Sequence, residues 1–98
     1  MKMKDYINHC IAANYFRGIE AVGGKIFFDE TGLNFKSHVF NIQTGEMYIN
    51  YSDIQEIRKR NTLGIVPNGI SIITKDGFDH KFVINQRNNV IEFLQSRL

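Results

Sequence analysis

A basic run followed closely by apolar residues is the segment of this sequence with side chains best suited to binding chemistry. Cations attract anionic lipid headgroups, and an apolar loop tip enters the membrane interface. At about 1 kcal/mol per surface cation, three cations contribute roughly 3 kcal/mol, or about a hundredfold in binding. The segment therefore predicts weak peripheral contact with an anionic lipid surface. Six residues make up this candidate site: Arg58, Lys59, Arg60, Leu63, Ile65 and Val66.

Two other interpretations of the same segment stay open. The apolar residues of a loop in a small domain usually pack against the core, which would leave the basic residues as a solvated strand face. Alternatively, an apolar surface beside exposed strand edges invites pairing, so the segment or a sheet edge would serve a protein partner or a homo-oligomer.

Catalytic and metal-binding chemistry have weaker support in the sequence. His9 and Cys10 are adjacent, so on a strand they point to opposite faces and do not form a nucleophile–base pair. A lone cysteine on a strand is usually a core residue, and we expect this of Cys10. His38 and His80 lack a metal-ligand spacing with carboxylates, and His80 is expected on the inner face near a turn, hydrogen bonded. The three glycines between positions 18 and 24 lack the lysine of a phosphate loop. We expect no enzyme activity, no metal and no cofactor.

Nucleic acid is disfavoured as a partner by the overall charge. The formal net charge is only +2, and no single-strand-binding motif is present. Tyr48, and with it Phe27, is expected on a solvated sheet face near Lys25 and Lys36, where aromatics stack bases. A tyrosine on a sheet surface is, however, also simply a good strand former.

Length and composition indicate one globular domain over residues 1–98, with residues 1–5 frayed. The 98 residues are 43% hydrophobic and 22% charged, which is ordinary for a folded domain. The single cysteine allows no internal disulfide and fits a reducing compartment. No apolar run matches a signal peptide or a membrane span. We therefore expect a cytoplasmic protein without a transmembrane segment, peripheral to the membrane if the lipid hypothesis holds.

The stretch 70–84 predicts the central hairpin of the fold. Asp76-Gly77 between two β-rich runs is a strong hairpin signal. A three-residue turn, Lys75 to Gly77 with Gly77 left-handed, pairs Ile72 with His80 and Ile70 with Phe82. This register gathers the large apolar side chains on one face and is favoured over a two-residue turn. The shared face is expected to hold Ile70, Ile72, Phe78, Phe82 and Ile84.

Five further strands and one helix complete the expected fold. Strands are expected at 9–17, 25–29, 33–37, 46–51, 54–60 and in both arms of the central hairpin. A glycine-rich bend is expected between 18 and 24, and the stretch from His38 to Gln43 is expected to lead into a turn. The four-residue loop 29–32 pairs Phe28 with Leu33 and Ile26 with Phe35. The spacing at 54 and 57 indicates a bulge or a short helical turn, and 61–69, with the only proline, is expected as a loop.

A C-terminal helix of about a dozen residues, 86–98, is expected to start at an Asn85 cap and to cover the open end of the sheet. Arg97 in its last turn would suit the helix dipole. Its apolar stripe is Val90, Ile91, Leu94 and Leu98, with Phe93 at the edge. Short strands in meander order followed by one helix indicate an antiparallel sandwich or a small barrel.

Several segments resemble the GRAM domain family, especially its small stand-alone bacterial members. The resemblance runs from about Ala13 to Leu94 and is carried by Gly23–Ser37, by Tyr51–Ile57, by Lys59–Gly69, by the Asp-Gly hairpin and by the helix with Glu92-Phe93-Leu94. It implies a pleckstrin-homology-like fold: mainly β, a seven-stranded, antiparallel, partly open barrel capped by one C-terminal helix. It also implies a binding module, for membrane lipids or proteins, rather than an enzyme. The family has no lipid-contacting motif that can be transferred residue by residue.

Overall fold

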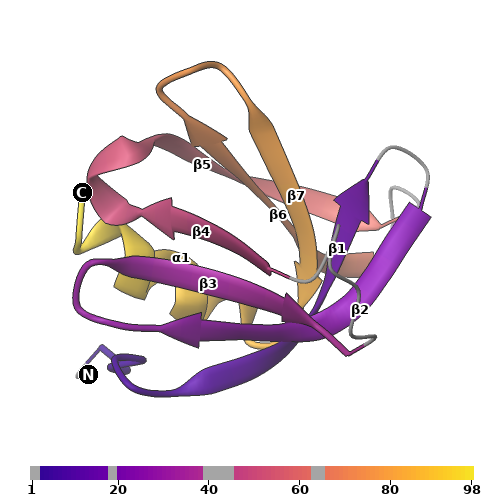
Figure 1. Cartoon of the computed structure of the whole chain (residues 1–98), viewed down its shortest axis with the longest axis horizontal. Coiled ribbons are helices and arrows are strands. Elements are labelled where there is room, and N and C mark those ends of the chain that lie inside the picture. Colours follow the sequence, from indigo (N-terminus) through magenta and orange to yellow (C-terminus); the bar gives the residue numbers. More distant parts are fainter. Residues whose placement is uncertain (1–2, 18–19, 39–45, 63–65) are drawn as a thin grey trace.

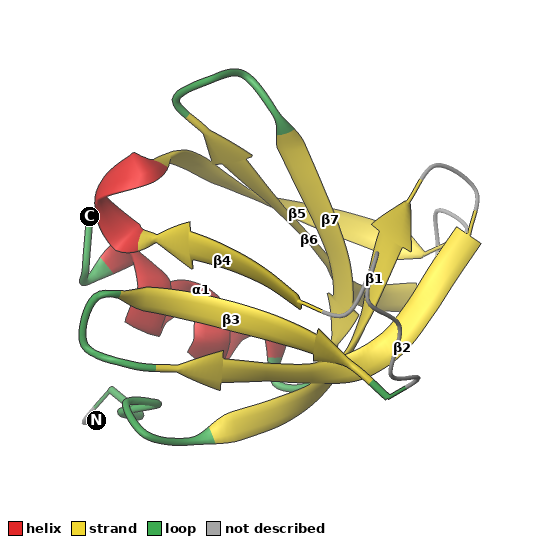
Figure 2. Cartoon of the chain, viewed as in Figure 1, coloured by secondary structure: helices red, strands yellow, loops and turns green. Residues whose placement is uncertain are grey.

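A computed structural model describes residues 3–17, 20–38, 46–62 and 66–98 of the chain. The chain forms one seven-stranded antiparallel sheet in the order β4-β3-β2-β1-β7-β6-β5, which curls around the C-terminal helix (Figures 1 and 2). The elements are β1 (Cys10–Arg17), β2 (Glu20–Phe28), β3 (Gly32–Ser37), β4 (Glu46–Asn50), a 3₁₀ turn η1 (Tyr51–Asp53), β5 (Ile54–Thr62), β6 (Val66–Thr74), β7 (Asp79–Ile84) and α1 (Arg87–Gln95). The prediction of a mainly β, partly open barrel with one capping helix is confirmed.

The sheet consists of two meanders joined by a long-range pair. Strands β1 to β4 pair in sequence, as do β5 to β7, and the two groups meet where β1 pairs with β7, with Tyr15 opposite Phe82. The first and last strands of the described sheet, β4 and β5, do not pair with one another. The barrel is therefore open along this seam, as the expected fold requires.

Both hairpin registers predicted from the sequence are confirmed. In the β6–β7 hairpin Ile70 pairs with Phe82 and Ile72 with His80, and Gly77 has φ +88°. Asp76 holds the turn by accepting hydrogen bonds from the Thr74 hydroxyl and from a backbone N–H beyond the glycine. Phe78 departs from the prediction, because it lies at the turn tip, 54% exposed, instead of on the inner face.

The second hairpin pairs Phe28 with Leu33 and Ile26 with Phe35, as expected. The prediction of a glycine-rich bend between 18 and 24 is wrong in part, because β2 already begins at Glu20 and continues through Gly23 and Gly24. Gly24 lies opposite Ser37 on β3, and the missing side chain lets the two strands approach closely. Glycine here permits strand packing instead of breaking the strand.

The expected loop 61–69 is also shorter than predicted. Strand β5 continues to Thr62 and β6 begins at Val66, so Pro67 lies within a strand. The β5–β6 register shifts between Arg60 and Thr62, and Pro67 lies at this irregularity, beyond the β6–β7 ladder that begins at Gly69. Proline is tolerated where a strand lacks regular ladder hydrogen bonds. The stretch expected from His38 to Gln43 lies outside the described residues after its first residue.

The start of β5 matches the expected bulge and helical turn. Tyr51 to Asp53 form the 3₁₀ turn η1, and the register shifts between Ile54 and Glu56. Strand β4 alternates as predicted, with Ile49 buried and Tyr48 exposed. Cys10, in contrast to the prediction, is exposed on β1.

The capping helix covers the barrel core with a different stripe from the predicted one. Phe93 is completely buried at its centre, while Leu98 lies beyond the helix and is 56% exposed. The N-cap is Gln86 in a left-handed conformation without a side-chain cap bond, so the Asn85 cap is wrong. Arg97 also follows the helix, and its guanidinium lies over the Phe93 ring. Helix α1 is nine residues long, and no helix in the described ranges is long and apolar enough to cross a membrane.

Candidate functional site

The basic run Arg58 to Arg60 does not form one patch. It lies in β5, where successive side chains alternate between faces, so Arg58 and Arg60 share the outer face of the sheet. Lys59 pairs with Ile70, an inner-face core residue, and so belongs to the other side of the strand. The predicted basic cluster is therefore divided between two faces.

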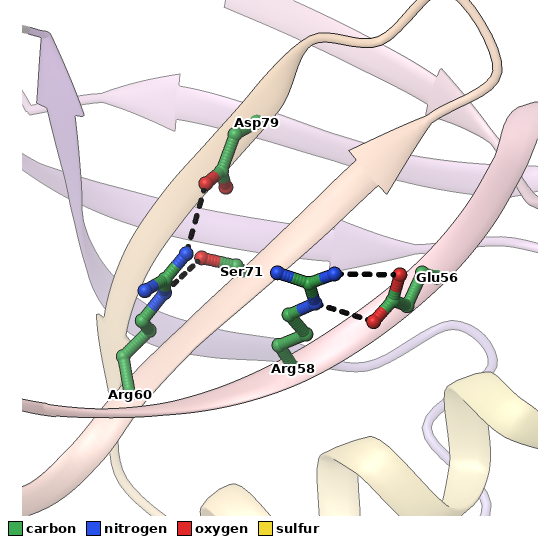
Figure 3. Close-up of polar contacts among 5 residues, drawn as sticks. All are labelled: Glu56, Arg58, Arg60, Ser71 and Asp79. Atoms are coloured by element: carbon green, nitrogen blue, oxygen red, sulfur yellow. Dashed lines mark hydrogen bonds and ion pairs between the residues drawn. The ribbon is translucent and has the colours of Figure 1, made fainter.

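Arg58 is occupied by a carboxylate on its own strand. Its guanidinium donates two hydrogen bonds to the carboxylate of Glu56, two residues earlier (Figure 3). The hydrogen bond from Arg58 lowers the pKa of Glu56, and the same interaction raises the pKa of Arg58. Both groups are well exposed, so the pair contributes little to stability. Its effect is to reduce the charge that Arg58 offers to a ligand.

Arg60 reaches across two neighbouring strands. Its Nε donates to the hydroxyl of Ser71 at 2.8 Å, and its Nη2 pairs with Asp79 at 3.2 Å (Figure 3). Ser71 is fully buried beneath this bridge. The backbone carbonyl of Arg60 accepts a hydrogen bond of 2.8 Å from Nη1 of Arg87, at the start of α1. Arg60 therefore connects β5, β6, β7 and the helix.

Lys81 adds a third cation to the outer face, and it was absent from the predicted site. Strand register places Arg58, Ser71, Lys81 and Phe16 in one row across β5, β6, β7 and β1. Lys81 is exposed and has no ion-pair partner in the described part of the chain. Because the β6–β7 register was predictable, pairing of Ser71 with Lys81 was a signal that could have identified this residue.

A shallow hollow of about 310 Å³ lies on this face beside Lys81 and Arg60. Its lining contains two cationic residues, two aromatic residues, two aliphatic residues, an asparagine and a glycine. Gly69 lines it opposite Arg60 on β5, where a Cβ would lie 2.8 Å from the carbonyl oxygen of Arg60. The lining residues are Phe16, Arg60, Asn61, Gly69, Ile70, Lys81, Phe82 and Val83. We call this the β5–β7 hollow.

The apolar half of the predicted site is not placed by the structure. Leu63 and Ile65 lie outside the described residues, and Val66 is described only as the first residue of β6. The β5–β7 hollow reaches Asn61, which is two residues before Leu63. The cationic face and the undescribed segment are therefore neighbours along the chain.

The histidines are distributed over separate elements. His9 precedes β1 and is exposed, His38 follows β3 and is exposed, and His80 is half-buried on β7. Nδ1 of His80 lies 3.2 Å from the hydroxyl of Tyr15, and its ring packs against Phe78 with centroids 4.5 Å apart. His80 is thus a hydrogen-bonded rim histidine, as predicted. Within the described residues, no group of three His, Cys, Asp or Glu side chains could hold a metal ion.

The environment of His80 makes the free energy of unfolding depend on pH. Burial lowers the pKa of His80 below 6.5, although Asp76 and Asp79 oppose the shift. The unfolded chain therefore binds this proton more readily than the folded chain, so the free energy of unfolding falls as the pH drops from 7 through the folded pKa. We expect His80→Gln to lose this slope in urea titrations between pH 7 and 5. A His9→Gln control that loses the same slope would contradict the assignment.

Comparison with known proteins supports the fold. No family model matches the chain, and no curated protein matches it. Among solved structures, the chain is similar to the C-terminal domain of an unknown protein from Leishmania infantum. The TM-score is 0.79 at 20% sequence identity, over 93% of this chain and 82% of that chain. A likeness at this identity shows a shared fold and nothing about ligands.

Proposed function

We propose that this protein is a non-enzymatic binding module of the GRAM type that associates weakly with anionic lipid surfaces. The contact runs over the outer face of β5 to β7 and the segment between β5 and β6. The observation that carries the proposal is the position of Lys81, an exposed cation that lines the β5–β7 hollow together with Arg60. The resemblance to GRAM domains and the barrel with its capping helix agree with it.

The ion pairs set the strength of this contact. Arg58 and Arg60 already bind Glu56 and Asp79, so the face presents three cations against two carboxylates. Each unpaired cation near an anionic surface contributes about 1 kcal/mol. Lys81 therefore supplies the largest share of the electrostatic attraction, and Ile65 and Val66 would add about 1.5 to 3 kcal/mol each if they entered the interface. Such an association is reversible and sensitive to salt.

Charge reversal at Lys81 tests the proposal. Lys81→Glu changes the local charge by two units, so we expect partitioning onto phosphatidylcholine vesicles with 30% phosphatidylserine to fall roughly thirtyfold, at about 1 kcal/mol per charge. Co-sedimentation measures this, with pure phosphatidylcholine vesicles for comparison. Lys75→Glu, an exposed lysine in the β6–β7 turn, is the matched control and should change binding much less.

A triple variant, Arg58→Ala with Lys59→Ala and Arg60→Ala, probes the originally predicted cations. Vesicle binding equal to that of the natural protein in this variant and in Lys81→Glu would reject the lipid site. The alternative is self-association or partner binding through the open edge of β5 or the segment after it. In that case light scattering would show a mass that rises with concentration, and Lys81→Glu would leave vesicle binding unchanged.

A further inference from the structure

A second exposed surface lies on the outer face of β1 to β4, away from the lysine and arginines discussed above. Strand pairing places two aromatic residues in one row and two lysines in the adjacent row. The first row is Cys10, Phe27, Asn34 and Tyr48, and the second is Ala12, Lys25, Lys36 and Glu46. We call Phe27, Tyr48, Lys25 and Lys36 the aromatic–lysine face.

The two rings are surface features and not part of the core. Phe27 is 40% exposed and Tyr48 is 43% exposed, whereas their strand neighbours Ile26, Phe28 and Ile49 are buried on the other side of the sheet. The Tyr48 hydroxyl contacts the Asp29 carboxylate at 2.9 Å and also bonds to Thr31. These bonds fix the ring at its edge while much of the side chain stays accessible.

The charge beside the rings favours an anionic partner. Lys25 and Lys36 are directly opposite each other on β2 and β3, an arrangement in which like charges repel. The Lys36 ammonium lies 5.4 Å from the centroid of the Phe27 ring. Lys25 is exposed and has no ion-pair partner in the described segments.

We propose that the aromatic–lysine face binds single-stranded nucleic acid, with bases stacked on Phe27 and Tyr48 and phosphates held by Lys25 and Lys36. Exposed aromatics on a sheet, interleaved with cations, are what this mode of binding needs, because every base has a stacking face. Two strand spacings of about 4.8 Å separate the rings. Each ring therefore receives its own base, and neither base is clamped between both rings.

The same geometry is poorly suited to a membrane. The rings lie on strands β2 and β4 and not at a loop tip, so they cannot be inserted into the acyl region without burying the polar residues beside them. The net charge of the whole chain disfavours nucleic acid as a partner. Net charge is a sum over all surfaces of the protein, however, and the aromatic–lysine face carries two lysines beside its two exposed rings.

Binding of fluorescein-labelled 15-nucleotide oligouridine and oligothymidine, followed by anisotropy at 50 mM salt, tests the proposal. We expect Phe27→Ala to weaken binding about tenfold or more, since each stacked base contributes on the order of tenfold in affinity. Phe78→Ala, which removes a ring 54% exposed in the β6–β7 turn, is the matched control and should leave affinity unchanged. Both substitutions are at exposed sites, and circular dichroism checks that the fold is kept.

Salt dependence and thiol protection give two further readouts. Lys25→Ala should reduce the slope of log affinity against log salt by about 0.7, the value for one phosphate contact on a single strand, while Lys75→Ala should not.

Cys10, the only cysteine, is exposed and opposite Phe27, so oligonucleotide should slow its reaction with a thiol reagent. Absence of binding, or binding that Phe27→Ala leaves unchanged, would overturn the proposal. Vesicle binding that depends on Phe27 would assign this face to lipid instead.

Discussion

Gly24→Ala is expected to lower the free energy of unfolding by at least about 3 kcal/mol, which is the upper part of the range for overpacked sites. A Cβ at this position would lie 2.1 Å from the carbonyl oxygen of Lys36 and 2.9 Å from the ring of Phe35. The carbonyl belongs to the paired strand β3, and the ring is buried in the core. The carbonyl cannot move without opening the β2–β3 ladder. Urea denaturation monitored by circular dichroism gives the change.

Gly23→Ala is the matched control, one residue earlier in the same strand. The nearest atom to its Cβ would be Oδ1 of Asn14 at 3.3 Å, on a side chain that can rotate away. Alanine also restricts the unfolded chain, which offsets part of any cost. We expect a change within about 1 kcal/mol. Equal destabilisation by both substitutions would mean that the effect is one of strand propensity and not of close approach.

Gly23 and Gly24 illustrate which parts of the fold could not be predicted from the sequence. Hairpin registers depend on a turn and on the alternation beside it, both local, so Ile70 with Phe82 and Ile26 with Phe35 were correctly predicted. A glycine that breaks a strand and a glycine that lets two strands pack have the same local sequence. Only the neighbouring strand distinguishes them, and the pairing of β1 with β7 is hidden for the same reason.

The candidate site was also predictable only in part: the sequence identifies the cations but not their partners on other strands. Adjacent basic residues were visible, but alternation along β5 separates Lys59 from its neighbours, and the partner of Arg60 is Asp79 on a strand 19 residues away. Ion pairs across strands depend on which strands are adjacent and in which register, so a run of cations in sequence overstates the charge available to a ligand. Lys81 follows from the predicted hairpin, once β5 is known to lie beside β6.

The second large loss of stability is expected on substitution of Phe93 in helix α1. Its ring contacts those of Tyr6, Phe28 and Tyr51, with centroids 5.6, 5.6 and 6.1 Å away, and no part of the residue is exposed. Removing a buried phenylalanine costs about 3 to 5 kcal/mol. A domain of this size has a total stability of only about 5 to 15 kcal/mol. We therefore expect Phe93→Ala to lower Tm by at least about 12 °C, at 4 to 8 °C per kcal/mol.

Leu98→Ala completes this test, because periodicity alone assigned Leu98 to the apolar stripe and Phe93 to its edge. The helix ends at Gln95, and Leu98 is 56% exposed, so its truncation should change the free energy of unfolding by less than about 0.5 kcal/mol. Thermal melts of the two variants compare the positions directly. A large loss at Leu98 with a small one at Phe93 would mean that the helix packs on the barrel through another face. The open end of the sheet would then lack the aromatic cluster that closes it.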